Sequence, residues 1–476
     1  MNTLVMQNND SSAGIAPLPR SLIWLQCFAF AVLYGVWSLP ETILIRHVCL
    51  ILGAVLSLYV LIRFRSLLYV NKALPLLLLL LLFVWVACQY FFITPNPDLQ
   101  MKEIAGIWKR TGIGFIFAVG LGLSLSSRSI RERQAALFDV YYWRLIYIGL
   151  LLPTLIYLLK YVLTFHANQW GFTAPDYLRL HYSSLPFYMP KTVYVAFCLP
   201  LFAIALSQIA TQIERQQWRP WSTLVYLLSC LAVLFVFYAE NIKNGIAYAL
   251  VLTIFFFANL LFKNIKRIKF KESIVLLAFI TAFGFFLAQH LQKNESWSTL
   301  YADTKVAIQI DQYDQWKFNG GRGYPNNELG KMVSITNYER IAWGVAGAQL
   351  LIENPLGYGL VERSFGHLAK IKWPESKLHQ NHSGWLDLAL GLGLPGIGLI
   401  LGALILALKQ CRAVPGPIGN FGFWLLLSLA LLWCTTEVSQ KVFFDWLVFA
   451  IAWVAALALG DTARDANTKS HTPSLS

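Results

Sequence analysis

Charged side chains are scarce in this sequence. Asp, Glu, Lys and Arg make up 13% of the 476 residues, about half of the roughly 25% found in an ordinary soluble protein. A soluble chain of this length would need a charged surface over its hydrophobic core, and there are too few charges here to form one. The same composition excludes disordered, fibrous and disulfide-scaffold classes. Because 57% of the residues are hydrophobic, we predict an all-α, polytopic membrane protein.

Cysteine is also sparse, and it follows no metal-binding or disulfide pattern. None of the seven cysteines forms a Cys-x-x-Cys pair, so neither a zinc site nor a disulfide framework is predicted. The formal net charge of +14 would suggest nucleic acid in a soluble protein. Here basic loops against anionic membrane lipids explain it better. We therefore expect membrane lipids as partners and no nucleic acid.

Long apolar runs are what the sequence has in abundance. A membrane-spanning helix needs about 20 apolar residues, and about 12 runs approach or reach that length. The fourth run is short, and the tenth contains several glycines and Pro395, which membrane helices tolerate. The expected spans are 21–38, 43–62, 73–93, 111–126, 141–164, 192–212, 221–239, 245–262, 273–290, 384–408, 420–436 and 442–460.

Basic residues are concentrated in alternate loops between these runs, which predicts the orientation. The positive-inside rule assigns these basic loops, and both termini, to the cytoplasm. The opposite loops are poorer in charge, and one of them is about 90 residues long by its predicted bounds. The expected organisation is a cytoplasmic tail (1–20), nine spans (21–290), a large periplasmic loop (291–383), three spans (384–460) and a cytoplasmic tail (461–476).

One helix is expected within the large loop. The run Thr336-Asn337-Tyr338-Glu339 fits a capping box, so a helix is predicted over 337–353, and Pro355 ends it. Arg340, Gly344 and Gly347 fall on one face of that helix by their spacing. This face predicts close approach of another backbone beside Arg340. Ordinary small-residue packing, with Arg340 directed to lipid headgroups, is an equally good interpretation.

Polar candidates gather on the outer side of the predicted membrane: Lys191, Lys243, Arg340, His379 and His382. Ionisable residues inside the spans are few, among them Asp387, Asp445 and Glu437, which weakens a proton-coupled transporter. A lysine at a span end either anchors the helix at the headgroups or binds an anion, and for a single lysine anchoring is the commoner role. The two histidines lack a third ligand, and Asp311 with Asp314 forms only a weak pair, so no metal site is predicted.

Three motifs in order resemble the O-antigen ligase and polymerase superfamily. They are Asn354-Pro355-Leu356-Gly357-Tyr358-Gly359, then Asn381-His382-Ser383-Gly384-Trp385-Leu386-Asp387, then the Gly-rich run 391–396. Upstream, Ser334, Arg340 and Trp343 are similar to the Ser-to-Arg-to-Trp stretch of that superfamily. The motif block covers about 334–396, and the plan of 12 spans with a large outer loop agrees over most of the chain.

The resemblance implies a metal-independent, inverting glycosyltransferase of the GT-C type, with no cofactor. A ligase of this superfamily transfers O-antigen polysaccharide from undecaprenyl pyrophosphate to the lipid A-core oligosaccharide, at the periplasmic face of the bacterial inner membrane. The essential histidine maps to His382 and the loop arginine to Arg340. A second arginine of the family has Lys243 in its place here, and Lys191 is the other candidate for that role. His379 and Asn381 are further candidates for contact with the pyrophosphate or the glycan.

Other functions fit parts of the same pattern. An O-antigen or exopolysaccharide polymerase, or a protein O-oligosaccharyltransferase, would share the fold and the donor. The segment His382-Ser383-Gly384-Trp385-Leu386-Asp387-Leu388 and the presence of only one large outer loop favour a ligase. A transporter would instead predict polar residues along a path at the membrane midplane.

Overall fold

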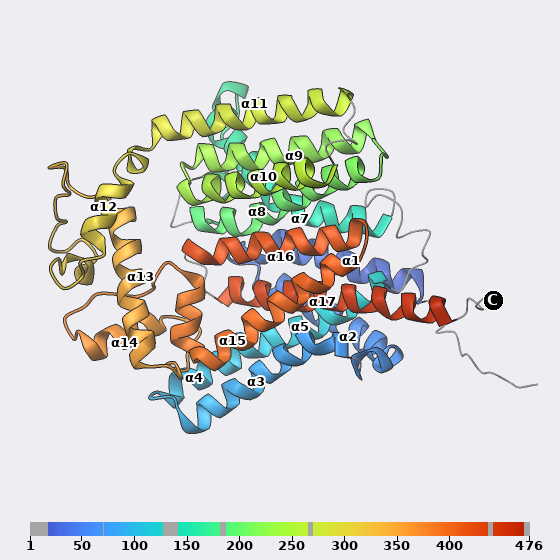
Figure 1. Cartoon of the computed structure of the whole chain (residues 1–476), viewed down its shortest axis with the longest axis horizontal. Helices are drawn as coiled ribbons and strands as arrows, with labels where there is room; N and C mark the ends of the chain where they lie inside the picture. The colour runs from blue at the N-terminus through green and yellow to red at the C-terminus, as the bar shows by residue number, and fades with distance from the viewer. Residues whose placement is uncertain are drawn as a thin grey trace, which may run out of the picture.

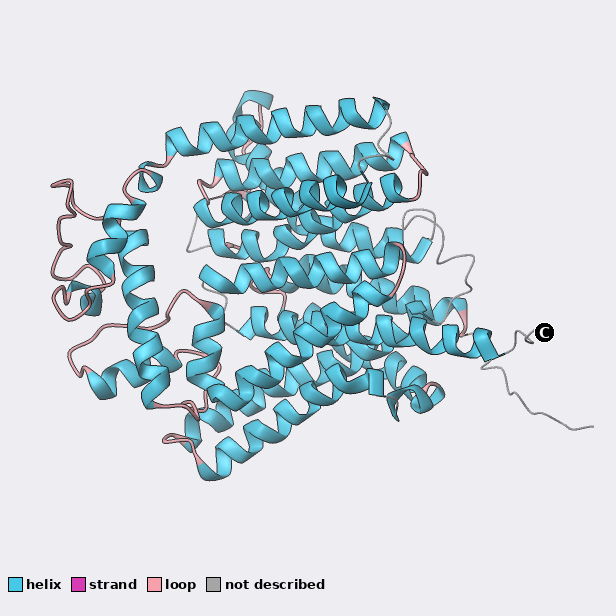
Figure 2. Cartoon of the chain, viewed as in Figure 1, coloured by secondary structure: helices cyan, strands magenta, loops and turns pink. Residues whose placement is uncertain are grey.

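A computed structural model describes residues 18–69, 71–126, 141–180, 187–264, 270–436 and 441–470 of the chain. Within these residues every regular element is helical, and strand-like pairing is limited to one isolated bridge between Asn326 and Met332 (Figure 2). The all-α prediction is therefore confirmed for the described part of the chain.

The helices are α1 (Arg20–Trp37), α2 (Ile43–Arg63), α3 (Leu74–Phe92), α4 (Pro97–Glu103), α5 (Lys109–Ser126), α7 (Tyr141–His166), α8 (Lys191–Glu214), α9 (Pro220–Ala239), α10 (Lys243–Asn264), α11 (Phe270–Lys293), α12 (Leu300–Ala307), α13 (Ile335–Glu353), α14 (Ser364–Lys372), α15 (Gly384–Ala413), α16 (Pro417–Thr435) and α17 (Lys441–Ser470). Short 3-10 turns are η1 (Arg65–Tyr69), η2 (Asn71–Ala73), η5 (Ala167–Trp170), η6 (Asp176–Leu178), η8 (Glu295–Trp297) and η9 (Gln315–Phe318), and the π-helical turn η3 (Ile104–Trp108) joins α4 to α5.

Among the described residues, twelve helices are long and apolar enough to cross a membrane, as the sequence predicts. One predicted boundary is wrong. The fourth span begins at Pro97 rather than near 111, with Asn96 as its N-cap, whose side chain accepts a hydrogen bond from the Leu99 amide at 3.1 Å. The last span, Lys441–Gly460, agrees with the predicted 442–460, and its helix α17 continues to Ser470. Glu437 lies outside the described residues.

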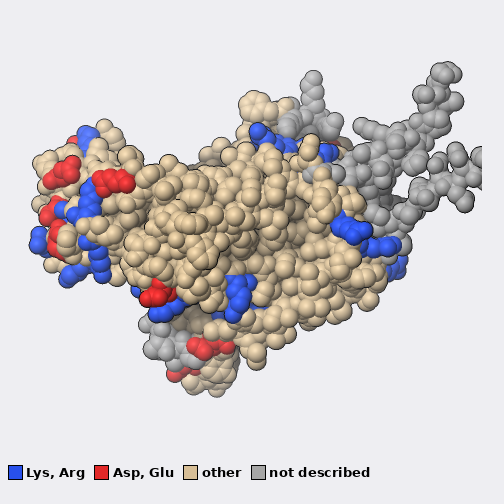
Figure 3. Space-filling model, turned by 90° about the horizontal axis from the view of Figure 1, so that it is seen from below, with Lys and Arg blue, Asp and Glu red and all other residues tan. Residues whose placement is uncertain are grey.

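The spans run side by side, and the residues between α11 and α15 gather at one end of the bundle, here called the loop end (Figure 1). The C-terminal end of α17 lies at the opposite end (Figure 1). Helix α13 crosses the loop end at a steep angle to the spans, with α12 and α14 beside it (Figure 1). In Figure 3 the loop end carries many of the acidic and basic side chains, while much of the adjoining surface is uncharged. This division is the one expected of a lipid-facing belt and a water-facing end.

Two spans lie at the centre of the bundle. In the most apolar 18-residue stretch of α8 every residue is buried, and in the corresponding stretch of α17 94% of the residues are buried. Helix α11 lies at the edge of the bundle, and only 22% of its most apolar 18-residue stretch is buried. A helix that is apolar on all sides is stable in water only when it is buried, so the exposed apolar faces at the edge fit a lipid surround.

Helix α15 is broken at Gly393, where φ is 70°. The break frees backbone carbonyls, and the Asn354–Gly359 segment uses them: the Tyr358 amide donates to Leu390 O at 2.9 Å and the Gly359 amide to Gly391 O at 2.8 Å. Any side chain at Gly357 would overlap the α15 backbone. The Asn-Pro-Leu motif and the Gly-rich motif, which the sequence relates only by order, are therefore in direct contact.

Helix α13 departs from the predicted capping box. It begins at Ile335 with Ser334 as N-cap, and no side chain caps it. The carboxylate of Glu339 instead accepts a 2.5 Å hydrogen bond from the Tyr324 hydroxyl. Of the two glycines on the predicted face, Gly347 does lie against another segment, the one containing Asn381, whereas Gly344 faces open space.

Candidate active site

A cavity of about 560 Å³ opens at the loop end between α8, α10, α13 and the end of α16. Three predicted cations line it, namely Lys191, Lys243 and Arg340, and we call it the cationic cavity. Much of the remaining wall is apolar. Apolar residues in that wall are Val195, Ile242, Ala247, Leu300 and Ile341. A largely apolar wall with a few cations suits an amphiphile whose charged group is anionic.

Lys243 is the first residue of α10 and is held in place by the large loop. Its Nζ donates to Asn337 Oδ1 at 2.8 Å and to Ser296 O at 3.0 Å, and it lies 4.6 Å from the centre of the Trp297 ring. Asn337 belongs to α13, so this contact joins the span to the helix that carries Arg340. A lysine that served only as a headgroup anchor would not need these loop partners.

Asn337 is itself oriented by a buried carboxylate. Its Nδ2 donates to Asp303 at 2.9 Å and to Ser296 O at 2.8 Å, which leaves Oδ1 facing Lys243. Burial opposes ionisation of Asp303, but its hydrogen bonds outweigh this and lower the pKa of the carboxyl below its ordinary value. The donors are the side chains of Asn327, Asn337 and Thr299 and the Ser334 amide. No local pattern in the sequence predicts this network, because the partners are far apart in the chain.

Arg340 and Lys191 reach the cationic cavity from two other elements. The Arg340 guanidinium donates to Asn244 Oδ1 at 2.5 Å, and Asn244 in turn donates to Thr435 O at 2.7 Å. Lys191 is exposed at the start of α8, and its Nζ donates to the backbone carbonyl of Glu240 at 2.8 Å. Lys243 is more enclosed than Lys191 and is tied to the Arg340 helix, which favours Lys243 as the second anion-binding cation.

His382 lies just before α15, in left-handed backbone with φ of 61°. Its imidazole lies flat on the Trp343 indole, with ring centres 5.0 Å apart and planes 11° apart. The Trp343 Nε1 donates to Trp316 O at 2.9 Å, which fixes the indole. Burial, together with the nearby Arg340 guanidinium, lowers the pKa of His382 to about 4. The imidazole is therefore neutral at pH 7 and able to accept a proton.

Asn381 positions this histidine and does not line the cationic cavity. It is buried; its backbone amide donates to the Asp387 carboxylate at 3.0 and 3.2 Å, and its Nδ2 donates to Trp343 O. These contacts fasten the segment to both α15 and α13. Asn381 therefore links the segment before α15 to the backbone of Trp343, the residue whose indole stacks on His382, and its predicted contact with substrate stays a prediction.

His379 is exposed and lines a different cavity, of about 880 Å³, which we call the polar cleft. Lys102, Glu103, Glu362, Arg363, His367, Gln380 and Lys441 also line it. Glu103 accepts hydrogen bonds from the amides of Val361 at 2.6 Å and Glu362 at 2.9 Å. The structure thus separates His379 from the three cations with which the sequence groups it.

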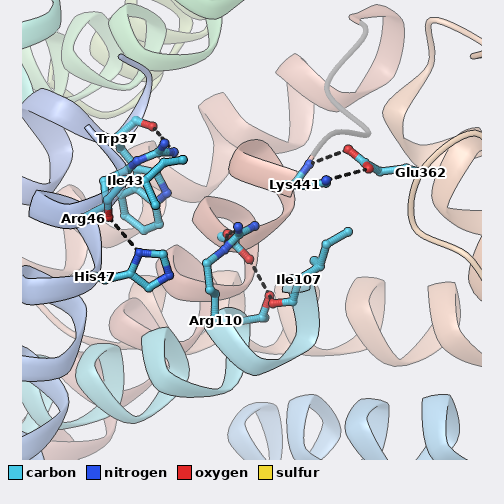
Figure 4. A network of polar contacts seen from close by, with 10 residues as sticks. Trp37, Ile43, Arg46, His47, Ile107, Arg110, Glu362 and Lys441 are labelled. Carbon is cyan, nitrogen blue, oxygen red and sulfur yellow. Dashed lines mark hydrogen bonds and ion pairs between the residues drawn. The ribbon is translucent and has the colours of Figure 1, made fainter. Parts of the chain in front are cut away.

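A network of charged residues holds α5 and α17 next to the polar cleft (Figure 4). Arg110 contacts the buried Asp445 carboxylate at 3.1 Å, and Thr111 donates to the same carboxylate at 2.6 Å. Lys441 approaches Glu362 at 3.6 Å (Figure 4). The ionisable Asp445, predicted inside a span, is therefore a partner in helix packing.

The described residues contain no group of three or more His, Cys, Asp or Glu side chains placed to hold a metal ion. Asp314, one of the weak Asp311–Asp314 pair, lies 3.5 Å from Arg322. Comparison with known proteins adds no further guide: no protein-family model matches the chain, and no curated protein matches it.

Proposed function

We propose that this protein is a glycosyltransferase that transfers O-antigen polysaccharide from undecaprenyl pyrophosphate to the lipid A-core oligosaccharide, at the periplasmic face of the bacterial inner membrane. The observation that carries the proposal is the convergence of Lys191, Lys243 and Arg340 on one largely apolar cavity. The neutral His382 lies near enough to Arg340 that the guanidinium charge helps to lower the pKa of the imidazole.

The cationic cavity fits the donor. Its apolar wall suits the first prenyl units of the carrier, and its cations suit the pyrophosphate. As the glycosidic bond breaks, the electron pair of that bond leaves with the pyrophosphate oxygen, and negative charge grows there. Fixed cations in a partly dry site stabilise such charge. Lys243 and Arg340 are held by Asn337 and Asn244, respectively, so little reorganisation is needed during the reaction.

His382 fits the role of general base. The acceptor hydroxyl oxygen forms a bond to the anomeric carbon, and its proton passes to the neutral imidazole. The leaving group is undecaprenyl pyrophosphate. Attack from the face opposite the leaving group inverts the anomeric centre. Proton transfer by a positioned side chain is typically worth about 10²- to 10⁴-fold in rate.

The deciding test is the lipopolysaccharide banding pattern of a deletion strain. We expect core without O-chains and polymer retained on the carrier lipid, with banding restored by the wild-type gene and not by His382→Asn. A single repeat unit on the core would instead identify a polymerase. Unchanged banding would contradict the proposal.

A further inference from the structure

Some residues that line the polar cleft are close in the chain to residues that line the cationic cavity or that contact its helices. Gln380 lines the polar cleft and is followed two residues later by His382, while Trp343, which stacks on His382, lies three residues after Arg340 in the cationic cavity. Thr436 lines the cationic cavity and Lys441 lines the polar cleft. The candidate base is therefore two residues from the lining of the polar cleft, and it stacks on a residue about one helical turn from the lining of the cationic cavity.

The two cavities suit different molecules. The cationic cavity has an apolar wall, whereas the polar cleft is rich in polar and ionisable side chains. Three cations line the polar cleft, Lys102, Arg363 and Lys441. Of its two carboxylates, Glu103 accepts two backbone amides and Glu362 approaches Lys441. Lys102 and Arg363 are exposed, and within the described residues no ion pair engages either side chain.

Arg363, which lines this cleft, is held in a constrained backbone conformation. It is the N-cap residue of α14, in left-handed backbone with φ of 61°. The amides of the two preceding residues are fixed by Glu103. The loop is therefore set rigidly enough to present a guanidinium to a ligand, and guanidinium groups bind phosphate and carboxylate in bidentate fashion.

We propose that the polar cleft binds the anionic saccharide region of the acceptor, with Lys102 and Arg363 as its cationic ligands. The proposal rests on the function proposed above and adds the site and the charge of the second substrate. A donor in the cationic cavity and an acceptor in the polar cleft would meet at His382, which is where the acceptor hydroxyl must lose its proton. The anionic group is a phosphate ester or a sugar carboxylate, since both offer the same oxygens to a guanidinium.

The test measures binding of lipid-free core oligosaccharide to the purified full-length protein by titration calorimetry. Lys102→Ala and Arg363→Asn remove one charge each, and asparagine tolerates the left-handed backbone at 363. We expect each variant to weaken the Kd about tenfold or more, the loss typical of one charged hydrogen bond. The matched control is Lys370→Ala, an exposed lysine of α14 that does not line the cleft and whose loss should leave Kd unchanged.

Treated oligosaccharides identify the anionic group. Enzymatic dephosphorylation should abolish the difference between wild type and variants if phosphate is bound, and carboxyl reduction should abolish it if a carboxylate is bound. Equal affinity of wild type for the untreated and the doubly treated, neutral oligosaccharide would overturn the inference. So would wild-type Kd and wild-type acceptor KM in both variants.

The two proposals fail separately in this design. If wild type transfers O-antigen polysaccharide but both variants keep the normal acceptor KM, the cleft assignment fails and the proposed function stands. If wild type binds the anionic oligosaccharide through Lys102 and Arg363 but transfers nothing to lipid A-core, the proposed function is wrong and the anionic glycan site stands.

Discussion

The imidazole of His382 lies against the indole of Trp343 with ring planes only 11° apart. This stack places a histidine from the start of a span against the helix that carries Arg340. The Trp343 carbonyl also accepts a hydrogen bond from the side-chain amide of Asn381, which ties the residue before His382 to the same helix. The imidazole is thus packed against a fixed indole, as the base proposed above requires.

Replacing His382 should abolish transfer while leaving the protein inserted and folded. His382→Ala removes the base, but it also places alanine in left-handed backbone. In His382→Asn, asparagine tolerates that backbone but has no basic side chain. We expect both variants to lose about 10²- to 10⁴-fold in rate, measured as O-antigen transfer in membranes. Near-wild-type transfer by His382→Asn would rule out the general-base role.

The pH dependence of transfer should reflect the lowered pKa of His382. A free histidine loses its basic form as pH falls below about 6.5, whereas His382 stays neutral down to about pH 4. We expect kcat/KM to stay flat on the acid side from pH 7 to about 5 and to fall near pH 4, since that ratio reports the free enzyme. An inflection near 6.5 that disappears in His382→Asn would contradict the burial of the imidazole.

The same shift has a consequence for stability. Between pH 4 and 6.5 the unfolded chain binds a proton at His382 that the folded chain does not, so the contribution of this group to stability decreases as pH falls through that window.

The sequence predicts all 12 spans because the length of an apolar run is a local property. It misplaces the start of the fourth span because Lys102, Glu103 and Arg110 make the stretch before residue 111 too polar to be recognised as part of a span. The partners of Glu103 are amides at Val361 and Glu362, and that of Arg110 is Asp445. Contacts this distant in the chain leave no local pattern.

In the candidate site, too, the sequence predicts what depends on local pattern and misses what depends on distant contacts. The sequence places the cations and His382 on one side of the membrane, because loop charge and motif order are visible in it. It groups His379 and Asn381 with them because they are close in the chain. In the structure His379 lines the polar cleft and its carbonyl accepts the Gly366 amide of α14, whereas Asn381 is buried and donates to the Trp343 carbonyl of α13. Both contacts join residues that are distant in the chain.

Transfer should survive removal of divalent ions. Among the described residues no group of three or more His, Cys, Asp or Glu side chains is placed to hold such an ion, and under the proposed function the cations of the cationic cavity supply the charge that the pyrophosphate needs. We expect in vitro transfer to be unchanged in EDTA. Loss of activity that magnesium or manganese restores would contradict this prediction and would direct attention to Asp311 and Asp314.

Lys243 and Lys191 should differ in their importance. Lys243→Ala removes a cation that loop contacts hold in the cationic cavity, so we expect most of the transfer activity to be lost. The activation free energy should rise by about 3–4 kcal/mol, as it does when one hydrogen-bond donor to a transition state is removed. Lys243→Arg keeps the charge and should keep activity. Transfer and donor-lipid affinity should be measured beside Lys191→Ala. Loss of both in the Lys191 variant alone would assign the second cation to α8.

Two glycines on α13 give a test of how the site is positioned. A Cβ on Gly347 would overlap Nδ2 of Asn381 and come within 2.8 Å of Leu386 Cδ2, whereas a Cβ on Gly344 meets nothing within 4 Å. Gly347→Ala should therefore displace the segment that carries His382. Overpacking of this kind typically costs about 1–3 kcal/mol. We expect a lower melting temperature in detergent micelles and a fall in transfer rate.

Gly344→Ala is the matched control on the same helix. Alanine is favoured over glycine in a helix interior by up to about 1 kcal/mol, and no neighbour opposes it here, so the variant should melt at or slightly above the wild-type temperature and transfer normally. If the two variants behave alike, close packing of α13 against Asn381 does not position the base. If Gly347→Ala loses transfer and the Gly347→Ala, Asn381→Ala double variant recovers stability but not rate, the contact itself aligns His382 with the acceptor.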